Sequence, residues 1–193
     1  LTGVFNAGKD DAGSDSPLVW DTTFDTLAKK TLWAGLPAYQ DNPNLIGWQI
    51  DNELKCHVGE DFNPHAVAHW HRWLEARFGT IAQLNEAWGT EIWSERYQRF
   101  DQVPAPVRTP FLHSASLSTA YRVFCRESIA EFMEAQVAIL RRHSAAPITH
   151  NTVPFFSLNQ ERMFANLDFA SFDAYAPRDR WSSIVFDNDF CRP

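Results

Sequence analysis

The sequence has few of the features that mark secreted, membrane-spanning or nucleic-acid-binding proteins. Its three cysteines, Cys56, Cys125 and Cys191, are odd in number and widely spaced, so they do not form the disulfide framework of a small secreted domain. No stretch approaches about 18 uninterrupted apolar residues, and the amino terminus lacks a basic region followed by an apolar one. These absences predict a cytoplasmic protein with reduced thiols that is neither exported nor inserted into a membrane.

Positive charge is also scarce. The chain has 17 lysines and arginines against 24 acidic residues, a net charge of -7, and no basic run is longer than the pair Arg141-Arg142. Because phosphate backbones are bound by clustered positive charge, we expect no nucleic-acid partner. The 193 residues are 45% hydrophobic, which is enough for a globular core. The 14% of aromatic residues mostly fit core packing, but they also suit a site where sugars stack on rings.

An apolar, β-branched run at residues 45–50 is followed directly by Asp51, Asn52 and Glu53. This pattern predicts a strand that carries acidic groups at its carboxyl end. In α/β barrels, ligands and chemistry gather where strands end, so Glu53 is the first candidate for catalysis. Burial there favours the protonated form of a carboxyl group, as a proton donor requires. The alternative is a structural glutamate that caps the next helix or pairs with an arginine.

Helical periodicity is clearest after this strand. Asn63-Pro64 suits the cap and first position of an amphipathic helix that Gly79 ends, and a long helix is predicted from near Ser114 or Ser116 to about His143. Strands are expected at residues 147–152 and 167–175, and this order with a long crossover implies parallel pairing. The remaining expectations are a loop at 1–17, short helices within 23–39 and at 81–88, no helix at 101–110 and a helical turn at 160–164.

Several blocks of sequence occur together in an order that is typical of one enzyme family. The segment NPNLIGWQIDNE at residues 42–53 closely resembles the acid/base segment of glycoside hydrolase family 42, the β-galactosidases. The resemblance extends over roughly residues 40 to 177. It continues through RWL at 72–74, FGT at 78–80, LNEAWGT at 84–90, IWS at 92–94 and LDFASFDAY at 167–175.

The resemblance implies an α/β fold, a (β/α)8 TIM barrel, present here as about strands 4 to 6 with their helices in one partial domain at residues 1–193. A complete barrel takes about 250 residues, so the chain is expected to be incomplete. Glu53 is implied as the general acid/base and Asn52 as the group that binds the sugar 2-hydroxyl. The nucleophile, a glutamate on the seventh strand, is expected outside this chain, since Asp168 and Asp173 belong to other blocks.

Further residues follow from their positions in the resembled family. Trp93 is implied as an aromatic wall of the galactose site, with core packing as the alternative. Asp173 and Tyr175 are expected to line the sugar pocket or position the missing glutamate, or else to bind neighbouring loops. His150 and Asn151 lie where groups that contact the substrate or support the acid belong, without an assigned role.

A metal site deserves consideration because four histidines lie near Cys56. His65 and His69 stand four residues apart, a spacing that can bind zinc. Some relatives carry a cysteine cluster in this loop, but residues 61–67 contain none. We therefore predict no metal, and histidines without a metal are the default.

The predicted function is retaining hydrolysis of terminal non-reducing β-D-galactose residues, without a cofactor. A galactoside is the expected partner, and relatives of this family are commonly homotrimers. The alternative is a non-catalytic carbohydrate-binding or structural remnant, because only one catalytic carboxyl is identified. Another barrel glycosidase, such as a cellulase or β-mannanase, is a weaker rival.

Overall fold

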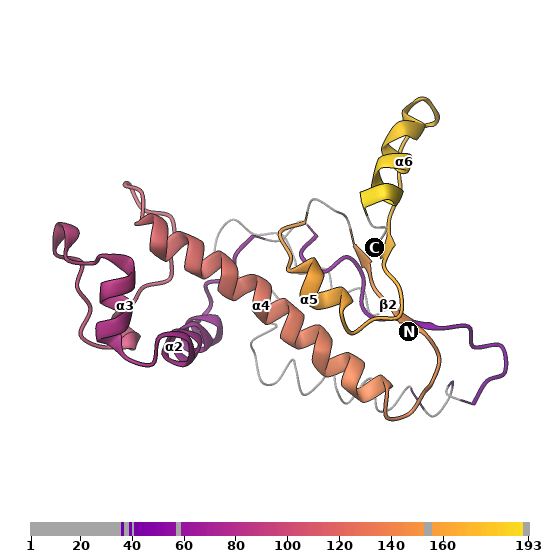
Figure 1. Cartoon of the computed structure of the whole chain (residues 1–193), viewed down its shortest axis with the longest axis horizontal. Helices are drawn as coiled ribbons and strands as arrows, with labels where there is room; N and C mark the ends of the chain where they lie inside the picture. Colours follow the sequence, from indigo (N-terminus) through magenta and orange to yellow (C-terminus); the bar gives the residue numbers. More distant parts are fainter. Residues whose placement is uncertain (1–35, 37–38, 40, 57–58, 153–155, 191–193) are drawn as a thin grey trace.

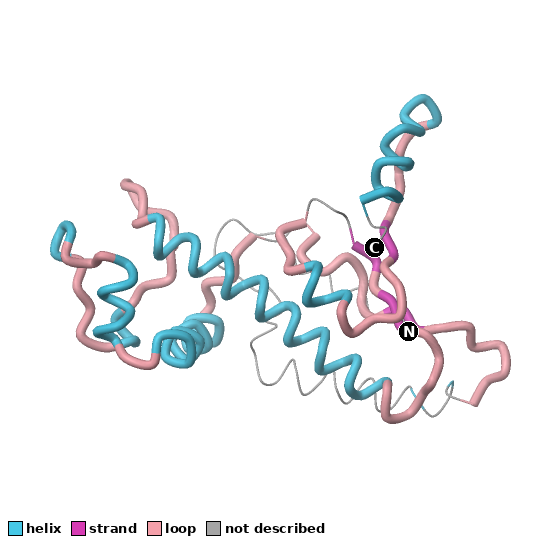
Figure 2. Tube along the Cα trace, viewed as in Figure 1, coloured by secondary structure: helices cyan, strands magenta, loops and turns pink. Residues whose placement is uncertain are grey.

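The computed structural model describes residues 36, 39, 41–56, 59–152 and 156–190, and it shows an α/β arrangement. Figure 1 shows the helices and strands in space, and Figure 2 shows how far helix predominates over strand. The elements in chain order are β1 (Trp48–Gln49), α2 (Pro64–Phe78), α3 (Ile81–Trp88), the 3-10 helices η1 (Ile92–Ser94) and η2 (Phe100–Gln102), α4 (Ala115–Leu140), β2 (Ile148–Thr149), β3 (Asn151–Thr152), α5 (Gln160–Phe164), β4 (Ser171–Phe172), η3 (Arg178–Arg180) and α6 (Trp181–Phe190).

The strands pair in parallel, as the sequence predicts. β1 pairs with β2, placing Trp48 opposite Ile148, and β3 pairs with β4, placing Asn151 opposite Ser171. Gly47 explains how closely β1 approaches the segment before β2, because a Cβ there would lie 3.0 Å from the carbonyl oxygen of Pro147. The long crossover through α4 is the connection that parallel strands require.

Helix α4 connects the two ends of the molecule. In Figure 1 it crosses the view diagonally, with α2 and α3 beside its amino-terminal half and the strands and α5 beside its carboxyl-terminal half. Its start is fixed by Ser114, whose hydroxyl accepts a hydrogen bond from the backbone N–H of Leu117 at 3.3 Å. Arg162 of α5 binds Glu134 of α4 through two hydrogen bonds of 2.7 and 2.8 Å, which holds α5 along the helix.

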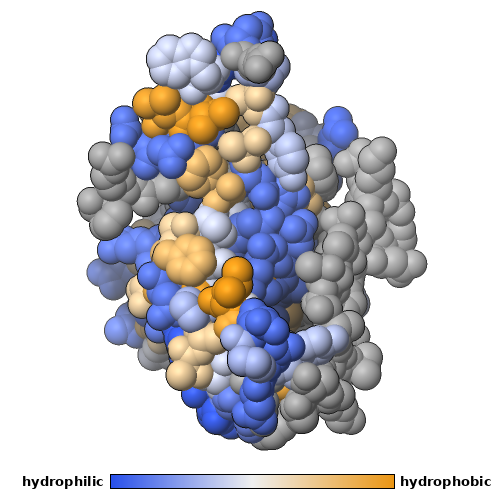
Figure 3. All heavy atoms as spheres, turned by 90° about the vertical axis from the view of Figure 1, so that its right-hand side faces the viewer, coloured by the Kyte–Doolittle hydropathy of each residue, from blue (hydrophilic) through white to orange (hydrophobic). Residues whose placement is uncertain are grey.

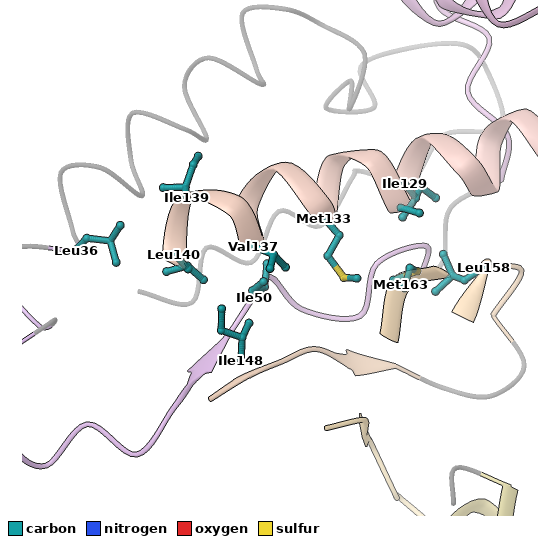
Figure 4. Packing of buried hydrophobic residues seen from close by; sticks show 11 residues of the cluster. Leu36, Ile50, Ile129, Met133, Val137, Ile139, Leu140, Ile148, Leu158 and Met163 are labelled. Atoms are coloured by element: carbon teal, nitrogen blue, oxygen red, sulfur yellow. The ribbon is translucent and has the colours of Figure 1, made fainter. Parts of the chain in front are cut away.

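The carboxyl-terminal half of α4 packs on the strands. Figure 4 shows Met133, Val137 and Leu140 pointing from the helix toward Ile50, which follows β1, and Ile148, the first residue of β2. All five are buried. This cluster fixes the distance between α4 and the end of β1, where the acidic residues follow.

The amino-terminal half of α4 belongs to a second, aromatic cluster with α2 and α3. Trp70 of α2 is fully buried and lies 5.0 Å from Tyr121 and 5.5 Å from Phe124 between ring centroids. Rings at such separations contribute about 0.5–1.5 kcal/mol per pair beyond the area they bury. The same helix therefore forms a wall of both hydrophobic clusters.

The boundaries of α2 and α3 follow from their caps. The Asn63 side chain accepts hydrogen bonds from the N–H groups of His65 and Ala66, with Pro64 in the first turn, as predicted. Thr80 and Gln83 form a capping box at the start of α3. Gly89 ends α3 with a φ of 64°, a left-handed conformation that favours glycine.

Some expected boundaries differ from the structure. Residues 101–102 lie in η2, because a single 3-10 turn fits before the first proline of the 101–110 loop. The strand expected at 167–175 is paired only at Ser171–Phe172, and the one at 147–152 is split into β2 and β3 around His150. The expected loop at 1–17 and most of the expected helix within 23–39 lie outside the described residues.

Helix α6 stands apart from both clusters, at the upper right of Figure 1. Val185 and Phe186 are 46% and 55% exposed, and the apolar atoms at the top of Figure 3 lie over this helix. In the part of the chain that the structure describes, no helix combines the length and apolar character needed to span a bilayer.

Candidate active site

The segment that follows β1 has an unusual backbone. Asp51, Glu53 and Lys55 have φ values of 50°, 42° and 76°, so alternate residues occupy the left-handed region. Each such non-glycine residue costs roughly 1–2 kcal/mol. Strain of this kind persists only where the surroundings impose it, and it is concentrated at functional sites. The contacts that hold this segment therefore identify the groups on which the site depends.

His150 is the first of these contacts. Its imidazole is fully buried, with Nδ1 2.7 Å from the carbonyl oxygen of Ile50 and Nε2 3.4 Å from the backbone nitrogen of Leu54. A carbonyl only accepts, so Nδ1 carries the proton and Nε2 accepts from Leu54. Burial lowers the pKa of His150, while the bond to Ile50 and the neighbouring carboxylates oppose this shift. The neutral ring thus connects the end of β1 to the segment after Glu53.

Asn151 is the second contact, and it is also buried. Its Nδ2 donates to Asn52 Oδ1 at 2.9 Å and to Asp173 Oδ2 at 2.6 Å. Its Oδ1 accepts from the backbone N–H of Glu53 at 3.2 Å and from Gln49 Nε2 at 3.0 Å. One side-chain amide therefore joins residues that follow β1 to the residue that follows β4.

Asp51 is held by helix α4. Gln136 donates from Nε2 to Asp51 Oδ2 at 2.6 Å, and Gln136 is buried. Burial raises the pKa of Asp51, while the Gln136 hydrogen bond and the nearby His150 lower it. The acid that precedes Asn52 and Glu53 is thus half-buried and fixed to helix α4.

Glu53 is half-buried and lies next to Cys56. Burial raises the pKa of the Cys56 thiol, and a hydrogen bond to the Glu53 carboxylate and the charges of Glu53 and Asp173 raise it further. The two carboxylates are therefore both close enough to act on one thiol. None of the ion pairs within the described residues involves Glu53, so the structural alternative of pairing with an arginine has no support there.

Asp168 has a different environment from Asp173. Its Oδ2 accepts from the backbone N–H of Ile148 and from Arg141, both at 2.6 Å. These two interactions lower the pKa of Asp168. Asp168 thus links the start of β2 to the segment that leads into β4. This structural role lies at the opposite end of the strands from Glu53.

The structure brings together three of the five predicted site residues, namely Asn52, Glu53 and Asp173. Trp93 belongs to η1, but its side chain lies outside what the structure describes. Tyr175 is 85% exposed, and no hydrogen bond within the described residues joins it to the other three. The roles of all five stay predictions.

Sequence reasoning gave no role to His150 and Asn151 and did not single out Gln136. One signal was available for Gln136, because it lies on the apolar face of α4 beside Met133, Val137 and Leu140. A polar side chain in such a position needs a buried partner.

The histidine cluster does not form a metal site in the described part of the chain. No three His, Cys, Asp or Glu side chains gather there in a way that would hold an ion. His69 instead lies 3.9 Å from Glu131, and His57 is outside the described residues. Burial and the charge of Arg72 lower the pKa of His69.

Comparison with known proteins decides the family. The family model described as β-galactosidase, glycoside hydrolase family 42, matches residues 21–192. The chain belongs to this family. The β-galactosidase YesZ of Bacillus subtilis is 53% identical over 150 residues, which cover 78% of this chain and 23% of that protein.

Solved structures agree with this family assignment and with the fold. A β-galactosidase from the Antarctic haloarchaeon Halorubrum lacusprofundi is 29% identical with a TM-score of 0.80, over 88% of this chain and 26% of that one. A β-galactosidase from Bacillus circulans sp. alkalophilus is 25% identical with a TM-score of 0.81, over 92% and 27%. The family 42 chain is therefore part of a (β/α)8 barrel, as predicted, and it spans about a quarter of the length of the relatives it matches.

Proposed function

We propose that the protein is a retaining β-galactosidase that removes terminal non-reducing β-D-galactose residues, with Glu53 as its general acid/base. The observation that carries this proposal is the position of Glu53 at the carboxyl end of a parallel strand, with Asn52 and Asp173 joined beside it through Asn151. Barrel enzymes place their catalytic groups at this end of the strands. The three relatives named above are all called β-galactosidases, which supports the substrate class.

Retaining hydrolysis assigns Glu53 two tasks. As an acid it protonates the glycosidic oxygen while the leaving group departs, and as a base it then takes a proton from the water that releases galactose. The first step also needs a carboxylate nucleophile about 5–5.5 Å from the acid/base. We propose that this glutamate comes from a part of the protein beyond this chain, because Asp168 and Asp173 are both held by structural hydrogen bonds.

The remaining predicted site residues complete the proposed pocket. Asn52 binds the 2-hydroxyl, Asp173 lines the sugar site next to it, and Trp93 and Tyr175 supply aromatic surface to the galactose ring. No cofactor enters this chemistry, because the two carboxyl groups perform both proton transfer and attack. A homotrimer and a cytoplasmic location also stay proposals, supported by the family resemblance and the cysteine pattern respectively.

The test is made on the protein expressed from its complete reading frame. We expect hydrolysis of both phenyl and 2,4-dinitrophenyl β-D-galactoside by the wild type. Glu53→Gln should lower kcat/KM for the phenyl substrate by about 10²–10⁴-fold, and much less for the dinitrophenyl substrate, whose leaving group needs no protonation. Glu60→Gln, at an exposed glutamate seven residues later in the chain, is the matched control and should leave both values unchanged.

Three results would contradict the proposal. Equal losses on both substrates in Glu53→Gln would remove the acid/base role from this residue. Galactoside binding without turnover by the wild type would favour the alternative of a non-catalytic carbohydrate-binding protein. Turnover of a β-mannoside or β-glucoside in place of the galactoside would favour another barrel glycosidase.

A further inference from the structure

We infer that Asn151 is a positioning residue, whose one side-chain amide sets Asn52, Glu53 and Asp173 relative to each other. The inference builds on the proposed function, because it assigns to a residue without a known role the task of orienting the proposed acid/base and its neighbours. Asn151 itself is buried, and we assign it no contact with the sugar.

The hydrogen bonds of Asn151 use its full capacity. A side-chain amide has two N–H donors and an oxygen with two lone pairs. Both donors are used, to Asn52 at 2.9 Å and Asp173 at 2.6 Å, and both lone pairs are used, by Glu53 at 3.2 Å and Gln49 at 3.0 Å. Rotating the amide by half a turn would oppose donors to donors and acceptors to acceptors. The group therefore has one orientation, and four partners are fixed by it.

The contact with Glu53 acts on its backbone. Glu53 has a φ of 42°, which a glutamate adopts only when its surroundings over-determine it. The Asn151 oxygen accepts the N–H of this residue, while His150, the preceding residue, accepts the next N–H, that of Leu54. His150 and Asn151, at the junction of β2 and β3, thus bind consecutive backbone amides of residues 51–55, which we call the acid-bearing turn. The direction of the Glu53 side chain follows from this turn.

The contact with Asn52 decides which end of that amide meets a ligand. Its Oδ1 accepts from Asn151, so the amino group Nδ2 is the end that remains for a substrate. A sugar hydroxyl at this position is then bound as an acceptor. Asn151 therefore determines that Asn52 offers a donor to the substrate, and it also fixes the position of Asn52.

Two substitutions at Asn151 test the inference by different physical routes. Asn151→Ala removes all four hydrogen bonds. Asn151→Asp preserves the shape, but it replaces a donor with a carboxylate that faces Asp173 and the oxygen of Asn52. The matched control is Thr149→Ala, which removes the hydrogen bonds of Thr149 to Phe169 and Ser171 and so loosens the same strands without touching the acid-bearing turn.

The first measurement is kcat/KM for phenyl and 2,4-dinitrophenyl β-D-galactoside with the protein from its complete reading frame. For Asn151→Ala we expect a loss of about 100-fold on the phenyl substrate, the usual effect of a small misplacement, and a much smaller loss on the dinitrophenyl substrate. Asn151→Asp should give a similar loss, because its carboxylate cannot donate to Asn52 and Asp173. The ratio of kcat/KM between the two substrates does not depend on the fraction of folded enzyme, so partial unfolding of a variant would not change it.

The second measurement does not depend on activity. If Asn151 holds the turn, its loss moves the Glu53 carboxylate away from Cys56 and the pKa of that thiol falls. A lower pKa increases the thiolate fraction, so alkylation of the Cys56 peptide by N-ethylmaleimide should accelerate in Asn151→Ala and remain unchanged in Thr149→Ala.

The outcomes separate the two proposals. An unchanged substrate ratio together with unchanged Cys56 alkylation in both Asn151 variants would overturn the positioning role. A wild type without galactosidase activity, combined with faster Cys56 alkylation in Asn151→Ala, would overturn the proposed function and uphold the positioning of the turn. Equal effects of Thr149→Ala on both measurements would reduce Asn151 to a general strand contact and overturn the inference.

Discussion

Gln136, four residues before the end of helix α4, donates a 2.6 Å hydrogen bond to Asp51, two residues before Glu53 in the chain. Both groups are largely removed from water, and their hydrogen bond attaches the long helix to the acid-bearing turn. Because α4 is packed along most of its length, it provides a fixed reference for a backbone that is otherwise strained.

Replacing Gln136 with leucine should destabilise the protein and weaken the turn. The substitution removes the buried donor from a half-buried carboxylate, which costs about 1–3 kcal/mol. We expect a lower midpoint of thermal unfolding and a loss of kcat with little change in KM. Gln136→Glu offers a comparison of the same size, which restores the contact when one of the two acids is protonated. A Gln136→Leu protein as stable as the wild type would show that Asp51 does not need this partner.

Asp51→Asn should stabilise the protein at neutral pH. Since the pKa of Asp51 in the folded protein is raised above 3.8, its ionisation destabilises the fold, and this penalty grows as the pH rises from 3.8 through the raised value. Asparagine does not ionise, still accepts from Gln136 and tolerates a left-handed backbone. The unfolding midpoint of the variant should exceed that of the wild type at pH 7, and the gap should shrink toward pH 3.8. A gap that is constant with pH would assign the effect to the backbone alone.

Glu53→Gln should make Cys56 more reactive. Besides burial, a hydrogen bond to Glu53 and the charge of that carboxylate raise the pKa of the Cys56 thiol, so removing the charge increases the thiolate fraction. We expect faster alkylation of the Cys56 peptide by N-ethylmaleimide, followed by mass spectrometry, which separates it from the buried Cys125. Cys125 should react slowly in every variant, because burial raises its pKa to about 12. Identical rates in Glu53→Gln and the wild type would mean that the thiol and the carboxylate are apart in solution.

Asn85→Ala should loosen the loop that carries Trp93. The buried Asn85 side chain donates to the carbonyl of Tyr97 at 2.7 Å and accepts from the N–H of Tyr97 and from Thr90. Its loss leaves these groups unpaired, at a cost of about 1–3 kcal/mol. If Trp93 forms a wall of the sugar site, KM for the galactoside should rise more than kcat falls.

The exposed Glu86, next to Asn85 on the same helix, offers the control Glu86→Ala. This variant should match the wild type in both unfolding midpoint and KM. An Asn85→Ala protein with a lower unfolding midpoint but an unchanged KM would confirm the structural role of the Asn85 hydrogen bonds and show that Trp93 does not contact the substrate.

The helices could be predicted well because their signals are local. Helices α2 and α4 begin where the sequence predicts, at Asn63-Pro64 and Ser114, and Gly79 and Gly89 follow the ends of α2 and α3. A capping side chain binds an amide two or three residues away, so the chain encodes it without reference to the fold. The strands were less well predicted. Their paired length depends on distant neighbours, and β2 and β3 are separated by a buried histidine that faces the opposite strand.

The position of the site at a strand end was predicted from the sequence, but the hydrogen bonds within the site were not. Glu53 and Asn52 follow an apolar run, and this pattern indicates a strand end in any α/β sheet. The contacts of Asn151 with Asn52 and Asp173 join residues 99 and 22 positions apart. Only the parallel register of the strands brings these side chains together, and a single sequence does not display that register.

Helix α4 is shared by the strand-side cluster and by the aromatic cluster with α2 and α3. Neither cluster can open fully without exposing a face of the same helix, so the two ends of the molecule are expected to protect their amide hydrogens from exchange as one cooperative unit. A cavity made at Trp70, far from the acid-bearing turn, would then also speed amide hydrogen exchange around Gln136 and in the turn itself.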